Sequence, residues 1–226
     1  MCCLFGFIDY AGVLSVKQKN RLIRKLSIAA EARGTDATGV AYNTSRGLQI
    51  YKRPLAAHRL HLRIPAEARA VMGHTRMTTQ GSAKKNYNNH PFFGCVKRKS
   101  FALAHNGVLW NDRGLRHTKH LPKTKIQTDS YVAVQLLEQQ KALDFDSLAK
   151  MAEQVEGSFS FAVLDEQDAL WIVKGDSPLS IAYFPECGVY VYASTAEILN
   201  RALTRCGKQL GHRRTVEVEM GDLLKI

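Results

Sequence analysis

The second residue of the chain is a cysteine, and its place at the N-terminus suits it to act as a nucleophile. Methionine aminopeptidases remove an initiator methionine that precedes a small residue, so we expect Cys2 to become the first residue, with both a thiol and a free α-amine. An α-amine has a pKa of roughly 7.7–8.0 and can act as a base near neutral pH. The alternative is that Cys2 is a small apolar residue that begins a buried strand. Cys3 alternates to the opposite face and is expected only to pack.

Two charged residues could recognise the two charges of an amino acid. Arg76 stands where an apolar stretch passes into a polar loop, and a guanidinium can bind a carboxylate through two parallel hydrogen bonds. Asp129 stands at the start of a helical pattern, and its carboxylate could bind an ammonium group. The alternatives are a solvated loop arginine and a helix-start carboxylate favoured by the helix dipole.

The pair Asn106-Gly107 could stabilise a developing negative charge. The side-chain amide of Asn106 and the backbone N–H of Gly107 could converge on an oxyanion, whereas the alternative is an ordinary hairpin turn at the end of a strand. Further upstream, Arg33 to Gly39 contains two glycines with Asp36 between them, which favours a tight turn with a structural role.

Length and composition indicate one globular domain. The chain has 226 residues, of which 45% are hydrophobic and 23% charged, and a chain of this length can bury about 70% of its unfolded surface. The five cysteines include no Cys-x-x-Cys pair, so neither a disulfide framework nor a zinc ribbon is indicated. The N-terminal apolar run lacks a basic flank and stops at Asp9, which is too short for a signal sequence or a membrane span. We therefore expect a soluble, cytoplasmic protein.

The chain is strongly basic. Its 32 Lys and Arg residues against 20 Asp and Glu give a formal net charge of +12, with clusters at 97–99, 113–125 and 213–214. Such runs are usually solvated surface; an acidic partner protein or a nucleic acid are alternatives, although no nucleic-acid-binding motif is present. His58/His61 and His117/His120 have the spacing of helical metal ligands, but no carboxylate or thiol completes either set, so no metal is expected.

Apolar patterning predicts the elements of the first half of the chain. Buried strands are expected over 2–8 and 69–75, and a hairpin over 39–43 and 48–53. Ser15 is expected to cap a helix that runs from about Val16 to Ala32 and stops at Gly34. The polar segment 77–91 is predicted to be a loop, long enough to suggest function.

The second half is predicted in the same way. A strand over 101–105 is expected to end at Asn106-Gly107, and 112–125 to be irregular. Thr128 or Asp129 is expected to cap a helix to about Gln140, and Asp146 another to Val155. The remaining pattern predicts a helix over 196–205 and strands over 158–164, 170–174, 179–184, 189–193, 215–219 and 223–226. Strands at both ends with helices between them favour a single α+β domain in which two sheets are sandwiched by helix layers.

The candidate residues belong to short motifs that occur in a fixed order. These are Cys2, Arg33-Gly34-x-Asp36-x-x-Gly39, His74-Thr75-Arg76-x-x-Thr79, Asn89-His90-Pro91-Phe92, His105-Asn106-Gly107, Thr128-Asp129 and Glu156-Gly157-Ser158-Phe159. In this order they resemble the class II glutamine amidotransferase domain of the N-terminal-nucleophile hydrolase superfamily. The resemblance covers almost the whole chain, and it implies a four-layer αββα sandwich of two mostly antiparallel sheets flanked by helices, in a single glutaminase domain over 2–226.

The resemblance also implies roles for the candidate residues. Cys2 would attack the side-chain amide of glutamine with its own α-amine as base and form a γ-glutamyl thioester, while Asn106 and Gly107 hold the oxyanion. Arg76 would bind the α-carboxylate of glutamine, and Asp129 its α-ammonium.

Four further positions match the family less directly. Thr79 falls at a glutamine-contacting position of the loop, His90 matches a histidine near the pocket, and Arg33 and Asp36 would shape the wall beside the nucleophile. No metal or organic cofactor is implied.

Two positions depart from the family pattern. The family commonly has glycine after the nucleophile, where this chain has Cys3, which puts a close backbone approach in doubt. In many relatives the residue after the loop arginine is aromatic and helps to gate the exit of ammonia, whereas here it is Met77, so coupling to an acceptor site is expected to be looser or different.

The ammonia acceptor is not legible in this sequence. No synthase segment follows Ile226, so we expect a separate synthase chain to receive the ammonia, with free ammonia as the alternative product. Two other functions remain open. One is an N-terminal-cysteine hydrolase of another linear amide, which would not need Arg76 and Asp129; the other is a basic scaffold or nucleic-acid-binding protein with an inactive glutaminase fold.

Overall fold

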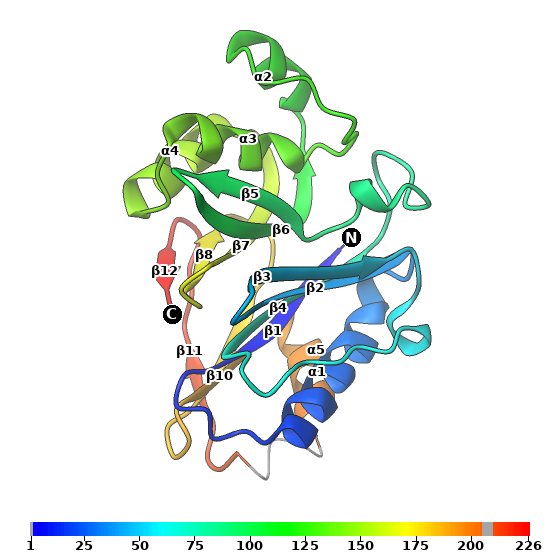
Figure 1. Cartoon of the computed structure of the whole chain (residues 1–226), viewed down its shortest axis with the longest axis vertical. Coiled ribbons are helices and arrows are strands. Elements are labelled where there is room, and N and C mark those ends of the chain that lie inside the picture. Colours follow the sequence, from blue (N-terminus) through cyan, green and yellow to red (C-terminus); the bar gives the residue numbers. More distant parts are fainter. Residues whose placement is uncertain (1, 205–209) are drawn as a thin grey trace.

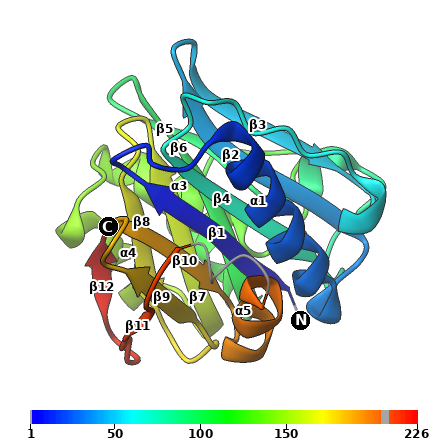
Figure 2. The same cartoon turned by 90° about the horizontal axis from the view of Figure 1, so that it is seen from below.

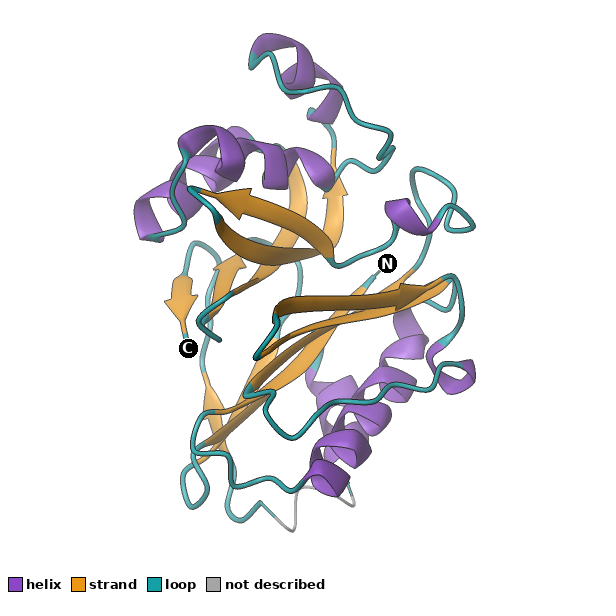
Figure 3. Ribbon diagram, in the orientation of Figure 1, coloured by secondary structure: helices purple, strands orange, loops and turns teal. Residues whose placement is uncertain are grey.

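Two β-sheets lie face to face, with helices on the outer side of each (Figures 1 and 2). The computed structural model describes residues 2–204 and 210–226, so the expectations that concern Met1, Arg205 and Cys206 lie outside the described residues. All strand pairs recorded in the two sheets are antiparallel. The order of layers is helix, sheet, sheet, helix, which confirms the predicted αββα sandwich (Figure 3).

The larger sheet has the strand order β11-β9-β10-β1-β4-β2-β3. Its strands are β1 (Cys3–Asp9), β2 (Ala37–Thr44), β3 (Gly47–Arg53), β4 (Ala70–Arg76), β9 (Ser180–Phe184), β10 (Val189–Ala193) and β11 (Arg214–Val216). β1 is the middle strand, paired with β10 on one side and β4 on the other, and all of its residues are buried. Cys2 therefore lies immediately before the middle strand of the sheet.

The smaller sheet has the order β12-β8-β7-β6-β5. Its strands are β5 (Phe92–Val96), β6 (Lys99–Leu109), β7 (Gly157–Asp165), β8 (Leu170–Lys174) and β12 (Leu223–Lys225). β7 pairs with β6 over the whole length of β7, from Phe101 opposite Asp165 to Leu109 opposite Gly157. This long pair carries Asn106 and Gly107 inside the sheet.

Helices cover the outer face of each sheet. α1 (Val16–Ala30) and α5 (Ala196–Leu203) pack on the larger sheet, whereas α3 (Tyr131–Gln140) and α4 (Phe145–Gln154) pack on the smaller one. α2 (Asp112–Thr118) and three short 3-10 helices, η1 (Glu31–Arg33), η2 (Ala57–Arg59) and η3 (Asn86–Asn88), complete the fold. Among the described residues, no helix is long and apolar enough to cross a bilayer.

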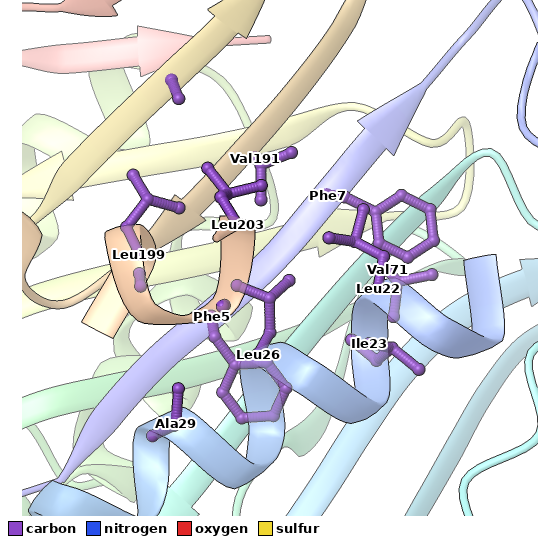
Figure 4. Packing of buried hydrophobic residues seen from close by; sticks show 14 of the residues in the cluster. Phe5, Phe7, Leu22, Ile23, Leu26, Ala29, Val71, Val191, Leu199 and Leu203 are labelled. Carbon is purple, nitrogen blue, oxygen red and sulfur yellow. The ribbon is translucent and has the colours of Figure 1, made fainter. Parts of the chain in front are cut away.

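The core has one layer outside each sheet and one between them. Phe5 and Phe7 of β1 pack against α1 residues such as Leu22 and Leu26 (Figure 4). The layer between the sheets instead contains many alanines, among them Ala102, Ala104 and Ala162. Fully burying one large apolar side chain stabilises a fold by about 1.5–3 kcal/mol, so the outer layers hold the helices in place, and small side chains let the two sheets approach closely.

α1 begins as predicted, with Ser15 as its cap. It ends at Ala30, slightly before the predicted end at about Ala32, and η1 leads from there to Gly34. The Ser15 hydroxyl accepts from the backbone N–H of Gln18, and the Gln18 side chain accepts from the Ser15 backbone N–H, which is a complete capping box. Gly34 follows η1 in extended conformation, and a Cβ there would lie 2.4 Å from the carbonyl carbon of Arg76. Glycine is required at this position by close packing against the end of β4, which places Arg33 next to that strand end.

Two predictions around β6 were wrong. The strand does not end at Asn106-Gly107 but continues to Leu109, because those residues pair with β7 instead of turning. β5 was not predicted, and it forms a hairpin with β6 through Lys97 and Arg98, which both have positive φ. The hairpin could not be predicted from the sequence, because glycine or asparagine usually marks such turns and this chain has two basic residues there.

Helix boundaries in the second half also differ from the predictions. The stretch 112–125 was predicted to be irregular, but its first part forms α2. Neither Thr128 nor Asp129 caps α3; Ser130 occupies that position, without a side-chain cap. Asp144, not Asp146, caps α4, in a reciprocal pair with Ser147, and Asp146 instead pairs with Lys150. α5 covers Ala196–Leu203, and its expected end at Arg205 lies outside the described residues.

Candidate active site

Cys2 lies buried at the start of β1, with only 8% of its surface exposed. Its Sγ donates a hydrogen bond to the carbonyl oxygen of Met77, at 3.5 Å. Burial raises the pKa of the Cys2 thiol, the nearby charge of Arg76 lowers it, and the charge of Asp129 raises it. A thiol in these surroundings is protonated at neutral pH, and it needs a base before it can attack a substrate.

Arg33 connects the backbone of Cys2 to Asn106. Its Nε donates to the Cys2 carbonyl oxygen at 2.8 Å, and its Nη2 donates to Oδ1 of Asn106 at 3.2 Å. These two bonds join the segment before β1 to β6 of the other sheet. Cys2, Arg33 and Asn106, which the sequence predicts to share a site, therefore lie together.

Gly107 occupies a position that other residues would not fit. Its φ is +145°, and a Cβ added there would lie 1.8 Å from the carbonyl oxygen of Ser158 in the adjacent strand. A side chain would thus clash with β7, and the backbone conformation is one that L-residues rarely adopt. Glycine stands at position 107 because β7 packs closely against it, and not because the chain turns there.

Arg76 ends β4, is 2% exposed, and has its guanidinium bound only by neutral acceptors. It donates to Oδ1 of Asn89 at 2.8 Å and to the carbonyl oxygens of Gln80 and Gly81. No carboxylate lies within 4 Å of it among the described residues. Burial lowers its pKa, while Cys2, Asp129 and Asp36 raise it. This buried cation therefore has no anionic partner in the described part of the chain.

Asp129 is the opposite charge of the same site, and it is 4% exposed. Its Oδ2 accepts from the backbone N–H of Leu109 at 2.7 Å, and its Oδ1 accepts from the Ser130 hydroxyl at 3.4 Å. No Lys, Arg or His side chain lies within 4 Å of the carboxylate in the described ranges. Asp129 and Arg76 both act on the Cys2 thiol but do not neutralise each other by direct contact.

Three buried histidines lie behind these residues. The His90 ring packs at a tilt against His74, with centroids 4.2 Å apart, and against Phe92, at 4.3 Å. Among the described residues, neither of its nitrogens has a hydrogen-bond partner. Nε2 of His74 is 3.0 Å from the carbonyl oxygen of His105, and Nδ1 of His105 is 2.8 Å from the Ser130 hydroxyl. Burial lowers the pKa of all three, that of His74 to about 3, so the rings are neutral near pH 7.

Asp36 and Thr79 lie at the exposed edge of the site. The Asp36 carboxylate accepts from the backbone N–H of Thr78 at 2.8 Å, and its own N–H donates to the Arg76 carbonyl oxygen, so it holds the loop that follows β4. Thr79 is exposed on that loop, and no hydrogen bond of its side chain is recorded within the described residues. Its predicted contact with substrate stays a prediction.

The two departures from the family pattern lie in different surroundings. Cys3 is fully buried in the core between β1 and α1, where its thiol donates to the Leu4 carbonyl oxygen at 3.2 Å and burial raises its pKa to about 11. Cys3 packs as predicted, and its bulk is directed away from the site. Met77 is 52% exposed, and its backbone carbonyl oxygen accepts the hydrogen bond from the Cys2 thiol.

Sequence reasoning missed three residues that hold the site together. Asn89 binds Arg76, Lys52 donates to the carbonyl oxygens of Asn89 and Pro91, and Leu109 supplies the N–H for Asp129. Asn89 stood in a recognised motif without an assigned role. Lys52 carried no signal, because a lysine in a hairpin strand is normally a solvated side chain.

The histidine pairs considered as metal ligands have other surroundings. Nδ1 of His58 is 3.0 Å from the Glu31 carboxylate. Over residues 2–204 and 210–226, no group of three or more His, Cys, Asp and Glu side chains is placed to hold a metal ion.

Known proteins resemble this chain in sequence. A family model, described as a glutamine amidotransferase domain, matches residues 74–201. The glutamine–fructose-6-phosphate aminotransferase (isomerizing) of Bacillus spizizenii is 30% identical over 185 residues, which cover 78% of this chain and 30% of that protein. The enzyme of the same name from Lactococcus lactis subsp. lactis is 31% identical over 180 residues, which cover 75% and 29%. The chain thus spans about 30% of the length of the curated relatives it matches.

A solved structure resembles the chain in fold. Glutamine phosphoribosylpyrophosphate amidotransferase from B. subtilis, complexed with ADP and GMP, superimposes with a TM-score of 0.73 at 20% identity. The superposition covers 100% of this chain and 47% of that one. At this identity the likeness shows a common fold.

Proposed function

The chain belongs to the glutamine amidotransferase domain family, and from this premise we propose that it hydrolyses the side-chain amide of glutamine to glutamate and ammonia, with Cys2 as the nucleophile. Residues 2–226 form a single glutaminase domain in this proposal, because both sheets contribute to one site. The observation that carries the proposal is the double contact of Arg33, which binds the Cys2 carbonyl oxygen and Oδ1 of Asn106. It brings a nucleophile and an oxyanion donor together across two sheets.

The substrate is recognised by its two charges. Arg76 binds the α-carboxylate of glutamine and Asp129 its α-ammonium, since each is a buried charge without a counter-ion in the described structure. Burying an unpaired charge costs free energy, and a zwitterionic ligand that fits between them offsets this cost. A linear amide without these two charges would leave both residues unpaired, which favours glutamine over other amides.

The first half-reaction forms a thioester. With Met1 removed, the α-amine of Cys2 takes the thiol proton, and Sγ attacks the amide carbon. The side-chain NH2 of Asn106 and the backbone N–H of Gly107 hold the tetrahedral oxyanion. The α-ammonium then protonates the leaving nitrogen, the C–N bond breaks, and ammonia departs.

The second half-reaction releases glutamate. The α-amine takes a proton from water, the hydroxide attacks the thioester carbon, and the C–S bond breaks with the electron pair returning to sulfur. The α-ammonium reprotonates the sulfur, so the enzyme returns to its starting state. No cofactor is required by this sequence of steps.

The remaining candidate residues support the site in this proposal. Arg33 and Asp36 form the wall beside Cys2, and Asp36 fixes the loop that presents Thr79 to substrate. His90 lies behind Arg76 as a neutral ring in the wall. A synthase receives the ammonia in this proposal, and we place it on a separate subunit. The curated relatives are named aminotransferases, and the match covers about 30% of their length, which supports a transferase as the acceptor.

The test is intact mass spectrometry of untagged protein before and after incubation with 6-diazo-5-oxo-norleucine, an electrophilic analogue of glutamine. We expect a mass without Met1 and one adduct that maps to Cys2. Cys2→Ala should form no adduct and hydrolyse no glutamine, whereas the matched control Cys3→Ala should still be labelled at Cys2. Retention of Met1 would remove the proposed base. A processed protein that forms no adduct, yet binds nucleic acid in a salt-dependent manner, would instead support a scaffold with an inactive site.

A further inference from the structure

Two lysines are held by backbone carbonyls in the larger sheet and its helix layer, and their surroundings differ. Lys19 of α1 is 1% exposed, donates to the carbonyl oxygens of Ala66 and Ala68, and lies 3.5 Å from the Asp9 carboxylate. Lys52 of β3 is partly buried and donates to the carbonyl oxygens of Asn89 and Pro91. No acidic side chain lies within 4 Å of the Lys52 ammonium in the described ranges. Lys19 is therefore neutralised by a counter-ion, and Lys52 is not.

A second cation, Arg76, binds the same asparagine as Lys52. Arg76 donates to the side-chain oxygen of Asn89 at 2.8 Å, while Lys52 donates to the backbone oxygen of the same residue. One asparagine thus lies between two cations, and neither has an acidic partner among the described residues. Burial lowers the pKa of Lys52, and the charge of Arg76 lowers it further, to about 8.

Lys52 also holds the segment that carries Asn89 against β3. The Asn86 side-chain amide donates to the Lys52 carbonyl oxygen at 3.0 Å, and the Lys52 ammonium lies 5.0 Å from the centre of the Phe92 ring. Both ends of the lysine therefore contact the segment 86–92. The Asn89 side-chain NH2 donates to the Ala83 carbonyl oxygen and to Oδ1 of Asn86, so Lys52 acts on Asn89 both directly and through Asn86. This attachment helps to fix the Asn89 oxygen that Arg76 binds.

Two cations without a counter-ion cost free energy in the empty protein, and the binding of an anion offsets this cost. We propose that Lys52 is a positioning and specificity-determining residue for the α-carboxylate of the substrate: it fixes Asn89, which orients Arg76, and its charge adds to the field that selects a carboxylate. The inference rests on the proposed function, in which Arg76 binds that carboxylate. It adds a residue of β3, three strands away from β1 in the larger sheet, to the determinants of substrate choice.

The first experiment measures binding without turnover. Isothermal titration calorimetry of L-glutamine is carried out on the Cys2→Ala protein, alone and combined with Lys52→Met, Lys52→Arg or Lys19→Met. We expect Lys52→Met to weaken binding about tenfold, which is typical for the loss of a hydrogen-bonded charge. Lys52→Arg should restore most of the affinity. Lys19→Met removes a more deeply buried lysine outside the site, and it should lower thermal stability while leaving glutamine affinity within about twofold.

A pH series separates the charge of Lys52 from a purely structural role. Raising the pH from 7 to 9 crosses the pKa of Lys52, which is about 8, so the ammonium loses its charge and glutamine binding weakens. Arginine keeps its charge over this range, so binding to the Lys52→Arg protein should weaken less. The α-amine of glutamine titrates identically in both measurements and cancels in the comparison.

A substrate without the carboxylate completes the test. With Cys2 intact, Lys52→Met should lower kcat/KM for glutamine about tenfold, through KM, and leave kcat/KM for 4-aminobutanamide nearly unchanged, because that amide has no α-carboxylate. Equal losses for both substrates, or unchanged glutamine affinity in Lys52→Met, would overturn the role of Lys52 alone. A parent Cys2→Ala protein that binds no glutamine at any pH would overturn the proposed function, and the inference with it.

Discussion

Arg33 and Asn106 are joined by a hydrogen bond of 3.2 Å between Nη2 and Oδ1. A guanidinium only donates hydrogen bonds, so the amide oxygen must face Arg33 and the NH2 group must point away from it. The same arginine binds the Cys2 carbonyl oxygen at 2.8 Å. One side chain thus sets both the backbone of the proposed nucleophile and the orientation of the proposed oxyanion donor.

Arg33→Gln is expected to slow the chemical step. Without the guanidinium, the Asn106 amide can rotate, and its NH2 group no longer points reliably at the oxyanion. Loss of one oxyanion donor typically costs a factor of about 100–1000 in kcat, so misorientation should cost about 10–100. Steady-state kinetics should show KM changed less than kcat, and Arg63→Gln, an exposed arginine, serves as the control. An Arg33 variant whose loss lies wholly in KM would argue against this role.

Asp129→Asn is expected to weaken glutamine binding with little effect on folding. The amide oxygen of asparagine can still accept from the Leu109 N–H, so the free energy of unfolding should change by about 1 kcal/mol or less. The negative charge for the α-ammonium is lost, so KM for glutamine should rise at least about tenfold. Glutaramate, which lacks the α-amine, is the matched substrate, and its kcat/KM should barely change. If both substrates suffer equally, Asp129 does not recognise the ammonium.

The three buried histidines make folding sensitive to acid. Their pKa values in the folded protein lie below the roughly 6.5 expected for an unfolded chain, with His74 at about 3. Below pH 6.5 the unfolded state therefore binds protons that the folded state does not, and stability falls as the pH falls. Each histidine contributes at most about 1.4 kcal/mol per pH unit, between its pKa in the folded protein and about 6.5, and the effect fades above pH 6.5. Denaturant unfolding at a series of pH values measures this slope.

His90→Phe removes the contribution of one of these histidines to the pH dependence of stability. Its ring makes no hydrogen bond to the part of the chain that the structure describes, and it packs between His74 and Phe92, so phenylalanine should fit and leave stability at pH 7.5 nearly unchanged. The slope of unfolding free energy against pH, between about pH 6 and pH 5, should decrease by about 1.4 kcal/mol per unit. An unchanged slope would mean that His90 does not titrate on unfolding.

Arg21→Glu is expected to stabilise the protein. The exposed face of α1 carries Lys17, Arg21, Arg24 and Lys25, and the helix contains no acidic residue. Glutamate at position 21 would face Lys17 and Lys25 at i±4 and Arg24 at i+3, which replaces repulsion by attraction worth about 0.5–1 kcal/mol in total. Chemical denaturation should show the gain, and Lys123→Glu, the same charge change on an exposed loop, should not.

The sequence is most informative where a local pattern and a tertiary requirement agree. The α1 capping box at Ser15 and the alternation of Cys3 into the core were predicted correctly, because each depends on neighbours in the chain. Asn106-Gly107 was misread as the end of a strand, because the glycine is required by the approach of Ser158 from β7, and no local pattern records that approach.

Most of the candidate site could be named from the order of motifs, but not the contacts that support it. The bond from Arg33 to Asn106, and the attachment of Asn89 to Lys52, join segments tens of residues apart in the chain. Their energetics depend on burial and on the charges brought near by the fold, which a single sequence does not express. Asp129 illustrates the difference: its position suggested a helix cap, yet its carboxylate binds β6 and not the start of α3.

The Arg33 contact also bears on how the protein folds. It closes a long stretch of sequence between the end of α1 and β6, and it can form only when both sheets exist and have docked face to face. Contacts between such distant segments carry a large loop-closure cost and tend to form late. During refolding, the circular dichroism of helices and strands should therefore return before Cys2 regains its reactivity. The rate at which that reactivity returns then reports the docking of the two sheets.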